Sequence, residues 1–361
     1  MSELTYESAH QILEQHPDPE TGRTLGSMGQ IRDVKVDENG NGIQYKLGIT
    51  SHSRPICDDV VDALRSKLTA AFTGVTVECE VVPHERPPAR IGQLGLRVKS
   101  VIIVGSGKGG VGKSTVAASV AVMLSKLGAK VGLMDADVYG PSITHLLGLE
   151  GRPSVDVDKK IQPIMLDGEM PVMSMGFLVE PDQAVIWRGP MLHGSVQQFL
   201  RDTSWGELDY LIIDMPPGTG DIALTLSQSV PIAGAVVVCT PQEVALLDAV
   251  KAINMFGKVN IPIAGMVENM SGFLCPDNGK TYDIFGSGGA REKAEAMDVP
   301  YLGGLPIDIR LRVAGDEGRL HNVIREDEQA AAPIEKVVRA LIRNLATRTA
   351  ATPPTASLPT L

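Results

Sequence analysis

Short apolar runs alternate with longer helix-compatible segments over most of the chain beyond residue 100. This pattern is typical of buried strands in a mainly parallel sheet that helices cover on both faces. The clearest runs are residues 100–104, 130–134, 210–213, 234–239 and 263–267. The pattern therefore predicts an α/β domain over residues 100–346.

The first 83 residues have a different pattern. Two segments have helical character, and three are strand-like, the last with alternating polar and apolar positions. The helical segments are 7–15 and 56–72, and the strands are 30–36, 43–49 and 75–82. Glu38-Asn-Gly-Asn-Gly42 separates the first two strands and is typical of a hairpin turn. We therefore expect a small α+β domain over residues 1–83.

Two further segments fit neither pattern. Residues 84–99 contain the pair Pro87-Pro88 and are predicted to be a linker. Residues 347–361 are rich in Thr, Ala and Pro and are predicted to be a disordered tail. The 361 residues thus suggest two domains, a linker and a tail.

Composition narrows the class of protein. Apolar residues make up 43% and charged residues 21%, as in soluble globular proteins, and no apolar run is long enough to span a membrane. The polar start of the chain does not resemble a signal peptide, and the four scattered cysteines match no disulfide framework. The net charge of −10 counts against broad nucleic-acid binding. We expect a cytoplasmic protein with neither a membrane nor a nucleic acid as its partner.

A glycine-rich loop follows the first predicted strand of the large domain. From Gly107 it matches G-x-x-x-x-G-K-[ST], the phosphate-binding loop of nucleoside triphosphatases. Glycines let the backbone N–H groups face the phosphates, and the following helix N-terminus adds positive potential. Lys113 is expected to bind the β- and γ-phosphates, and the Ser114 hydroxyl to bind Mg²⁺. The expected nucleotide-binding residues are Gly107, Lys108, Gly109, Gly110, Val111, Gly112, Lys113, Ser114 and Thr115.

The same loop also satisfies the dinucleotide fingerprint G-x-G-x-x-G, through Gly105, Gly107 and Gly110. Lys113 and Ser114 favour a triphosphate, because a dinucleotide site has no use for a lysine and a hydroxyl at these positions. The loop therefore predicts binding of ATP or GTP.

Carboxylates follow two of the predicted strands. Asp214 ends an apolar strand, as in a Walker B motif, and is expected to hold Mg²⁺ directly or through water. Asp135 and Asp137 follow another strand, and Asp135 is expected to support the Mg²⁺ shell. Strand-end residues lie at the carboxyl edge of the sheet, where ligands bind in this architecture. For an isolated aspartate there, helix capping would be the better interpretation, but three parts in the correct order favour a nucleotide site.

Lys108, near the start of the loop, resembles the additional lysine of the MinD/ParA/ArsA group of dimeric ATPases. The resemblance implies that Lys108 reaches the partner's phosphates in a homodimer and neutralises transition-state charge, as an arginine finger does. It also implies that Asp137 orients the attacking water. Lys108, Lys113 and Asp137 are thus the expected catalytic residues, with a solvated surface lysine as the alternative for Lys108.

Longer motifs across residues 100–340 resemble the Mrp-type iron–sulfur cluster carrier ATPases, in the family's order. They are Asp135-Ala-Asp-Val-Tyr-Gly-Pro-Ser-Ile143, Trp187-Arg-Gly-Pro-Met191, Asp214-Met-Pro-Pro-Gly-Thr-Gly-Asp221, Thr240-Pro-Gln242, Asn254-Met-Phe256 and Val267-Glu-Asn-Met-Ser271. The small domain resembles one shared with iron–sulfur assembly factors.

The resemblance to this family implies a homodimer that binds and hydrolyses ATP. The dimer would pass an iron–sulfur cluster to apo-proteins, with these clients and the assembly scaffolds as its partners. The resemblance implies that Asn269 contacts adenine, and an amide suits that role because it both donates and accepts hydrogen bonds. Arg188 remains open between the dimer face, the phosphates and a surface ion pair.

The chain departs from this family at the place where many members carry Cys-Pro-x-Cys-Gly. The motif here is Cys275-Pro-Asp-Asn278, so a homodimer offers two thiolates where a [4Fe–4S] cluster is ordinarily held by four. Asparagine is a poor substitute because iron–sulfur irons prefer soft anionic sulfur, whereas Asp277 offers an oxygen. Cluster type therefore stays open, with Cys275 as the expected cluster ligand.

The other three cysteines are expected to be structural. Cys239 and Cys79 lie in predicted strands and are interpreted as packing residues. Cys57 opens a predicted helix, where packing is the first interpretation and a helix-lowered pKa the alternative.

These observations leave several functions to compare. The favoured hypothesis is an ATPase that carries iron–sulfur clusters. The alternatives are a cluster-free, nucleotide-switched adaptor or chaperone, a MinD- or ParA-like positioning ATPase, and an ATP-driven reductase. The tail lacks a basic amphipathic stripe, which counts against membrane positioning. A reductase with a bridging cluster requires two cluster cysteines per subunit, and this motif has one.

Overall fold

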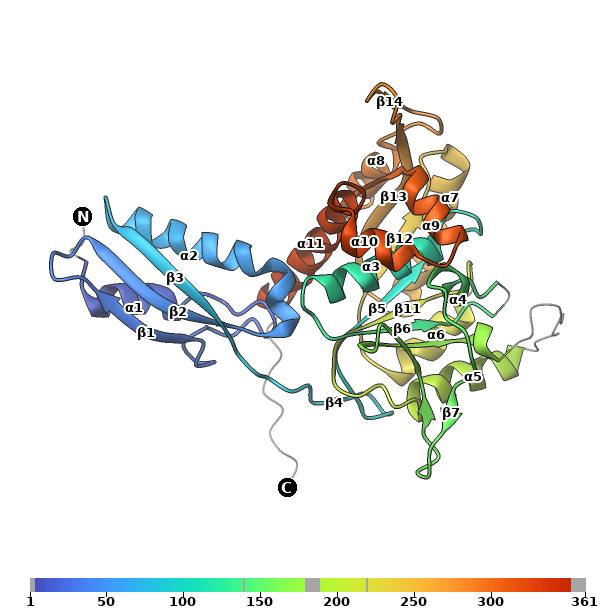
Figure 1. Cartoon of the computed structure of the whole chain (residues 1–361), viewed down its shortest axis with the longest axis horizontal. Coiled ribbons are helices and arrows are strands. Elements are labelled where there is room, and N and C mark those ends of the chain that lie inside the picture. The colour runs from blue at the N-terminus through green and yellow to red at the C-terminus, as the bar shows by residue number, and fades with distance from the viewer. Residues whose placement is uncertain (1–3, 139, 179–188, 219, 352–361) are drawn as a thin grey trace. The chain divides into compact units, whose positions relative to one another are not determined.

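The computed structural model describes residues 4–138, 140–178, 189–218 and 220–351. The chain forms two compact units, Met1–Arg86 together with Ile342–Leu361, and Pro87–Leu341. Each unit has its own hydrophobic core. Figure 1 gives the labels of the helices and strands.

The larger unit contains a sheet of ten strands within the described residues. The strands are β4 (Arg90–Ile91), β5 (Leu96–Gly105), β6 (Val131–Asp135), β9 (Ile164–Leu166), β10 (Met170–Ser174), β11 (Leu208–Asp214), β12 (Ile232–Cys239), β13 (Ile263–Leu274), β14 (Thr281–Tyr282) and β15 (Tyr301–Ile307). The main path runs β14-β13-β12-β5-β11-β6-β10-β9, with β15 paired to β13 and β4 to β5. The short strands β7 (Ser154–Val155) and β8 (Ile161–Gln162) pair separately.

The centre of this sheet is parallel. Strands β10, β6, β11, β5, β12, β13 and β15 pair in parallel along it, whereas β4, β9 and β14 pair antiparallel. The carboxyl ends of the parallel strands therefore meet at one edge. The predicted α/β class with a mainly parallel sheet is confirmed.

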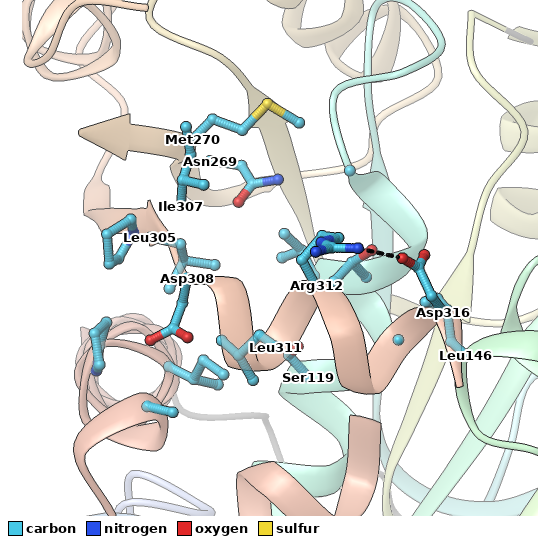
Figure 2. Close-up of a pocket in the computed structure, with 18 of the residues that line it drawn as sticks. Ser119, Leu146, Asn269, Met270, Leu305, Ile307, Asp308, Leu311, Arg312 and Asp316 are labelled. Carbon is cyan, nitrogen blue, oxygen red and sulfur yellow. Dashed lines mark hydrogen bonds and ion pairs between the residues drawn. The ribbon is translucent and has the colours of Figure 1, made fainter. Parts of the chain in front are cut away.

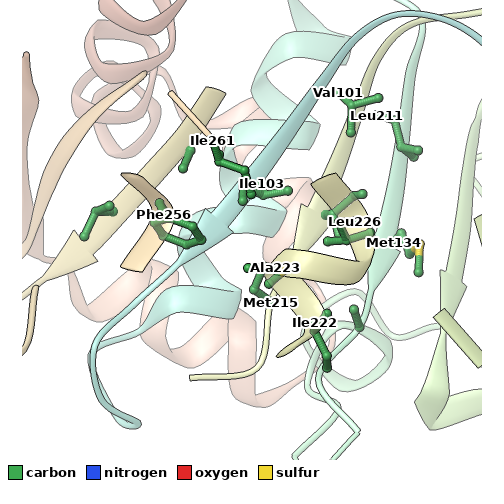
Figure 3. Packing of buried hydrophobic residues seen from close by; sticks show 14 of the residues in the cluster. Val101, Ile103, Met134, Leu211, Met215, Ile222, Ala223, Leu226, Phe256 and Ile261 are labelled. Atoms are coloured by element: carbon green, nitrogen blue, oxygen red, sulfur yellow. The ribbon is translucent and has the colours of Figure 1, made fainter. Parts of the chain in front are cut away.

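Helices bury both faces of the sheet. The helices of the larger unit are α3 (Lys113–Lys126), α4 (Ile143–Leu146), η2 (Met175–Phe177), α5 (Gly189–Asp202), α6 (Gly220–Ser229), α7 (Glu243–Lys258), α8 (Gly289–Ala296), α9 (Ile309–Asp316), α10 (Leu320–Glu326) and α11 (Glu328–Ala351), the last of which continues into the smaller unit. Val101 and Ile103 pack in one core with residues of α5 to α8, as Figure 3 shows in part. The intervening Ile102 and Val104 are also fully buried, and α3 contacts strands β5, β6 and β11. Alternate strand residues point to opposite faces, so helices cover both.

The smaller unit joins two helices to a three-stranded sheet. Its elements are α1 (Tyr6–Glu14), β1 (Ile31–Val36), β2 (Gly42–Ile49), η1 (Ser51–Ile56), α2 (Cys57–Ala71) and β3 (Thr76–Pro83). β2 lies in the middle, antiparallel to β1 and parallel to β3. Alternate residues of β2, namely Ile43, Tyr45 and Leu47, are buried in one cluster with apolar residues of α1 and α2. The predicted α+β architecture is confirmed.

Two predicted boundaries differ from the structure. The segment assigned to the linker contains β4, and β5 starts at Leu96, because these residues pair in an antiparallel hairpin. Helix α11 continues through Ala351, past the predicted start of the tail at residue 347. The polar side chains in its last turns form hydrogen bonds within the helix, since the hydroxyls of Thr347 and Thr349 donate to backbone carbonyls four residues earlier. Residues 352–361 lie outside the described residues.

The partly buried imidazole of His16 gives the smaller unit an expected pH dependence. Burial, together with the nearby positive charge of Lys67, lowers the pKa of His16 to about 4. The unfolded chain binds this proton near pH 6.5, so the free energy of unfolding should fall as the pH drops from about 6.5 to about 4. Calorimetry across this range should show a shallower decline for His16→Gln, and also for Lys67→Met, which removes the repelling charge. Identical slopes for all three proteins would contradict this prediction.

Candidate functional site

The glycine-rich loop connects β5 to α3 in a conformation that only glycine readily adopts. Gly110 and Gly112 have φ angles of 80° and 79°, in the left-handed region. A Cβ on Gly107 would lie 2.0 Å from the carbonyl oxygen of Asp248. Glycine is therefore required at Gly107 by close packing and at Gly110 and Gly112 by the backbone turn, as in a phosphate-binding loop.

Lys113 joins the loop to the strand-end carboxylates. Its Nζ lies 2.6 Å from Oδ1 of Asp214 and 3.4 Å from Oδ2 of Asp137, and it donates to Ser114 Oγ at 3.2 Å. The side chains of Lys113 and Asp214 are 6% and 0% exposed. The structure therefore brings together four of the residues that the sequence predicted for one site.

Two carboxylate oxygens in this group are buried and lack a hydrogen-bond partner, namely Oδ2 of Asp214 and Oδ1 of Asp137. Burial raises the pKa of Asp214, against the opposing effect of Lys113. Buried acceptors normally have partners. Unpartnered carboxylate oxygens beside a serine hydroxyl form a donor set that suits Mg²⁺ with a bound phosphate. Across the described residues, no group of three or more His, Cys, Asp or Glu is arranged as a metal site by itself.

Asp135 lies next to this group but faces protein donors. Its Oδ1 accepts from the backbone N–H of Asp137 at 3.0 Å, and its Oδ2 accepts from Ser174 Oγ at 2.9 Å and from Ile143 N–H at 3.4 Å. Burial and the Asp214 carboxylate raise the pKa of Asp135. Both oxygens of Asp135 are thus engaged within the protein.

A largely apolar cavity of about 370 Å³ opens beside the loop (Figure 2). The side-chain Nδ2 of Asn269 donates to the carbonyl of Val111 at 2.9 Å, and a Cβ on Gly112 would lie 2.2 Å from this Nδ2. Asn269 and the loop are therefore in close contact. The cavity is also lined by Thr115, Leu305, Ile307, Asp308, Leu311 and Arg312.

The sequence analysis missed the part of this lining that comes from β15 and α9. Its signal was weak: an apolar strand ends at Ile307, and Asp308 then caps α9 by accepting from Arg310 N–H at 2.8 Å. A capping aspartate has no special spacing to the phosphate loop, so only the fold brings it there.

Cys275 lies on a separate hairpin, six residues after Asn269, at the end of β13. Cys275 N–H donates to the carbonyl of Lys280 at 2.9 Å. The Asn278 amide accepts from Lys280 N–H at 2.9 Å and donates to the Tyr282 hydroxyl at 3.1 Å. The turn therefore uses the side chain of Asn278, whereas the Cys275 thiol is partly exposed.

Strand β13 is irregular between Asn269, which contacts the glycine-rich loop, and the hairpin that carries Cys275. Met270 has a φ of 58°, in the left-handed region, and the pairing with β15 shifts register between Asn269 and Phe273. A left-handed methionine is uncommon and costs free energy.

The remaining predicted residues lie apart from this group. Lys108 is partly exposed on the loop, and its carbonyl accepts from the Ser106 hydroxyl at 2.9 Å. Cys239 is buried on β12, where burial raises its pKa to about 12. Cys57 and Cys79 belong to the smaller unit. Arg188 lies outside the described residues.

No helix in the described part of the chain is both long enough and apolar enough to cross a bilayer.

Comparisons with known proteins agree with this geometry. A family model described as the NUBPL iron-transfer P-loop NTPase matches residues 97–342, and one described as an iron–sulfur cluster assembly protein matches residues 8–80. The iron–sulfur cluster carrier protein of Deinococcus radiodurans is 45% identical over 333 residues, covering 92% of this chain and 93% of that protein.

Solved structures are also similar to this chain. The nucleotide-binding protein of Archaeoglobus fulgidus, in complex with ADP, is 42% identical with a TM-score of 0.56, covering 62% of this chain and 88% of that one. The cell division ATPase MinD of Pyrococcus furiosus shares the fold at 22% identity, with a TM-score of 0.52 over 68% of this chain and 98% of its own. The resemblance inferred from the sequence motifs is confirmed: the chain belongs to the family of NUBPL iron-transfer P-loop NTPases.

Proposed function

We propose that this protein is an ATP-hydrolysing carrier that binds an iron–sulfur cluster and passes it to apo-proteins. The main support is the buried group of Lys113, Asp214 and Asp137 at a phosphate loop. It occurs in a chain that is similar over 92% of its length to a cluster carrier.

The residues at the loop have different roles in ATP hydrolysis. Ser114 and Asp214 would hold Mg²⁺, with Asp135 supporting its shell, and the metal would supply positive charge for the phosphates. Lys113 leaves its carboxylate partners and binds the phosphates, while Asp137 orients the attacking water. Once Lys113 binds the phosphates, Asp214 would be free to bind Mg²⁺, so metal and phosphate binding would support each other.

The base is expected to occupy the cavity beside the loop. About 370 Å³ of mainly apolar space suits a purine ring, and Asn269 supplies an amide at its edge. We assign this cavity to the adenine of ATP. Lys108, partly exposed on the loop, would act on the nucleotide of a second copy in a homodimer.

The cargo would bind at the Cys275 hairpin. A homodimer supplies two thiolates there, whereas a [4Fe–4S] cluster is ordinarily held by four. The remaining ligands would then be thiols of a scaffold or client protein. Transfer of the cluster would therefore break two iron–thiolate bonds to the carrier rather than four. Such a carrier would work in the cytoplasm among assembly scaffolds and apo-proteins.

One observation favours a second candidate, a cluster-free nucleotide-switched adaptor. The Asn278 side chain is used by the hairpin turn in two hydrogen bonds, so it contributes to folding of the turn rather than to metal binding. The two candidates differ in whether Cys275 binds iron.

Anaerobic reconstitution with iron and sulfide distinguishes the candidates. After desalting, iron and sulfide per dimer should be low but measurable in the native protein and absent in Cys275→Ser. They should rise toward roughly four of each in Asn278→Cys, because four thiolates then converge. Asn278→Ser is the matched control, since it loses the amide without adding a thiolate. ATP hydrolysis should be the same in all four proteins.

A cluster retained by Cys275→Ser would place the ligands elsewhere, with Cys57 the first to test. Iron in none of these proteins would favour the adaptor.

A further inference from the structure

We propose that Ser174 is a positioning residue of the nucleotide site. Its hydroxyl donates to the Asp135 carboxylate and fixes its orientation. That carboxylate in turn accepts hydrogen bonds from the backbone N–H groups of Asp137 and Ile143, at the two ends of the loop that carries Asp137. This inference rests on the proposed ATP hydrolysis, and it assigns a role to a strand-end serine outside the nucleotide-binding motifs.

The three residues Ser174, Asp135 and Asp214 lie in one row at the carboxyl edge of the sheet. Ser174 pairs in register with Asp135 across β10 and β6, and Asp135 pairs with Asp214 across β6 and β11. All three are fully buried. A buried carboxylate needs hydrogen-bond donors, and the protein supplies them to Asp135.

The direction of the Ser174 hydroxyl is determined by its two contacts. Its oxygen accepts from the backbone N–H of Gly176 at 2.9 Å, so its single proton is directed to Oδ2 of Asp135, also at 2.9 Å. Gly176 lies in η2, directly after β10. The serine therefore fastens the carboxylate to the rigid end of a neighbouring strand.

Asp135 in turn binds two backbone N–H groups that follow it in the chain, those of Asp137 and Ile143. Its Oδ1 accepts from Asp137 N–H at the start of the loop, and its Oδ2 accepts from Ile143 N–H at the end. Ile143 is the first residue of α4, whose N-cap residue Ser142 makes no side-chain capping bond. Asp135 supplies the acceptor instead, so one carboxylate determines the geometry of both loop ends.

This arrangement determines the position of Asp137. Its backbone N–H is held by Asp135, and its side chain lies 3.4 Å from the Lys113 ammonium. If the Ser174 hydroxyl is lost, Asp135 loses the donor that fixes its rotamer, and the backbone of Asp137 is held less firmly. Orientation of the attacking water depends on that position, whereas phosphate binding by Lys113 and the loop does not. Small displacements of a catalytic group have large effects on the chemical step.

The test compares the full-length protein with Ser174→Ala and Ser174→Thr. In Ser174→Ala, kcat for ATP should fall about tenfold, the effect of one lost buried hydrogen bond, with KM within about twofold. Hydrogen exchange in the nucleotide-free protein should become faster at the amides of Asp137 and Ile143. Ser174→Thr keeps the hydroxyl and should restore slow exchange and most of kcat. Ser229→Ala is the matched control, because it removes another buried hydroxyl, which donates to the Thr225 carbonyl at 2.7 Å.

Unchanged kcat and unchanged exchange in Ser174→Ala would overturn the proposal. So would faster exchange spread over all of β6 and β10 with a lowered Tm, because that pattern indicates lost packing rather than lost positioning. If the native protein does not hydrolyse ATP, the proposed function fails, and the exchange comparison still decides whether Ser174 fixes the loop.

Discussion

Lys113→Ala is expected to reduce ATP hydrolysis by about 10³-fold or more, because its charge faces the transferring phosphoryl group in a site that water barely screens. The side chain of Lys113 is 6% exposed, and its ammonium lies between Asp214 and Asp137. Its removal has a second effect in the nucleotide-free protein, since two buried carboxylates lose their cation. We therefore expect a lower Tm without metal and partial recovery when Mg²⁺ is added. Steady-state hydrolysis and thermal unfolding with and without Mg²⁺ measure both effects.

Lys99 offers the matched control for this experiment. It also forms a buried ion pair, with its Nζ 3.0 Å from Oδ1 of Asp209, and the two side chains are 8% and 2% exposed. Lys99→Ala should lower stability in a similar way while the folded protein keeps its turnover. Native-like turnover in folded Lys113→Ala would remove the basis for the nucleotide site.

Arg86→Ala is expected to destabilise the smaller unit by about 3–5 kcal/mol, the cost of leaving a buried ion pair without its cation. Arg86 Nη1 lies 2.7 Å from Oδ2 of Asp18 and 3.4 Å from Oε1 of Glu20, and Arg86 Nη2 donates to Gln30 at 3.2 Å. The side chains of Asp18 and Glu20 are 0% and 8% exposed, so solvent does not replace the guanidinium. Urea unfolding followed by hydrogen exchange in α1 and α2 measures the loss.

Two variants sharpen this prediction. Asp18→Asn combined with Arg86→Ala should recover part of the lost stability, because the double variant no longer leaves the Asp18 charge unpaired. Arg343→Ala breaks the pair with Asp59 in the same unit, where the side chains are 52% and 36% exposed. It should cost less than about 1 kcal/mol. Equal losses for Arg86→Ala and Arg343→Ala would contradict the role of burial.

Much of the sheet could be predicted from the sequence because its central strands are continuous apolar runs. Strand β10 was not predicted, since its five residues include Pro171, which normally argues against a strand. Strand β15 contains Gly303, Gly304 and Pro306, which also weaken a strand pattern. The helical end of α11 was missed because its threonines suggested disorder, whereas their hydroxyls bond within the helix.

The candidate site could be predicted where motif spacing carries the information. Lys113, Asp137 and Asp214 belong to recognisable motifs, and the structure brings them together. The contact between Ser174 and Asp135 depends on strand register across 39 residues of sequence, which no local pattern encodes. The sequence identified Asn278 as a poor metal ligand, but only the structure shows that its amide completes a turn.

The left-handed Met270 has a consequence for how this protein can diverge. It interrupts the β13–β15 ladder directly after Asn269, so the hairpin beyond it does not share a continuous hydrogen-bonded ladder with the part of β13 that lines the cavity beside the loop. Substitutions in the hairpin can then alter the surroundings of Cys275 while the glycine-rich loop keeps its structure. The fold thus allows the glycine-rich loop and the Cys275 hairpin to evolve separately.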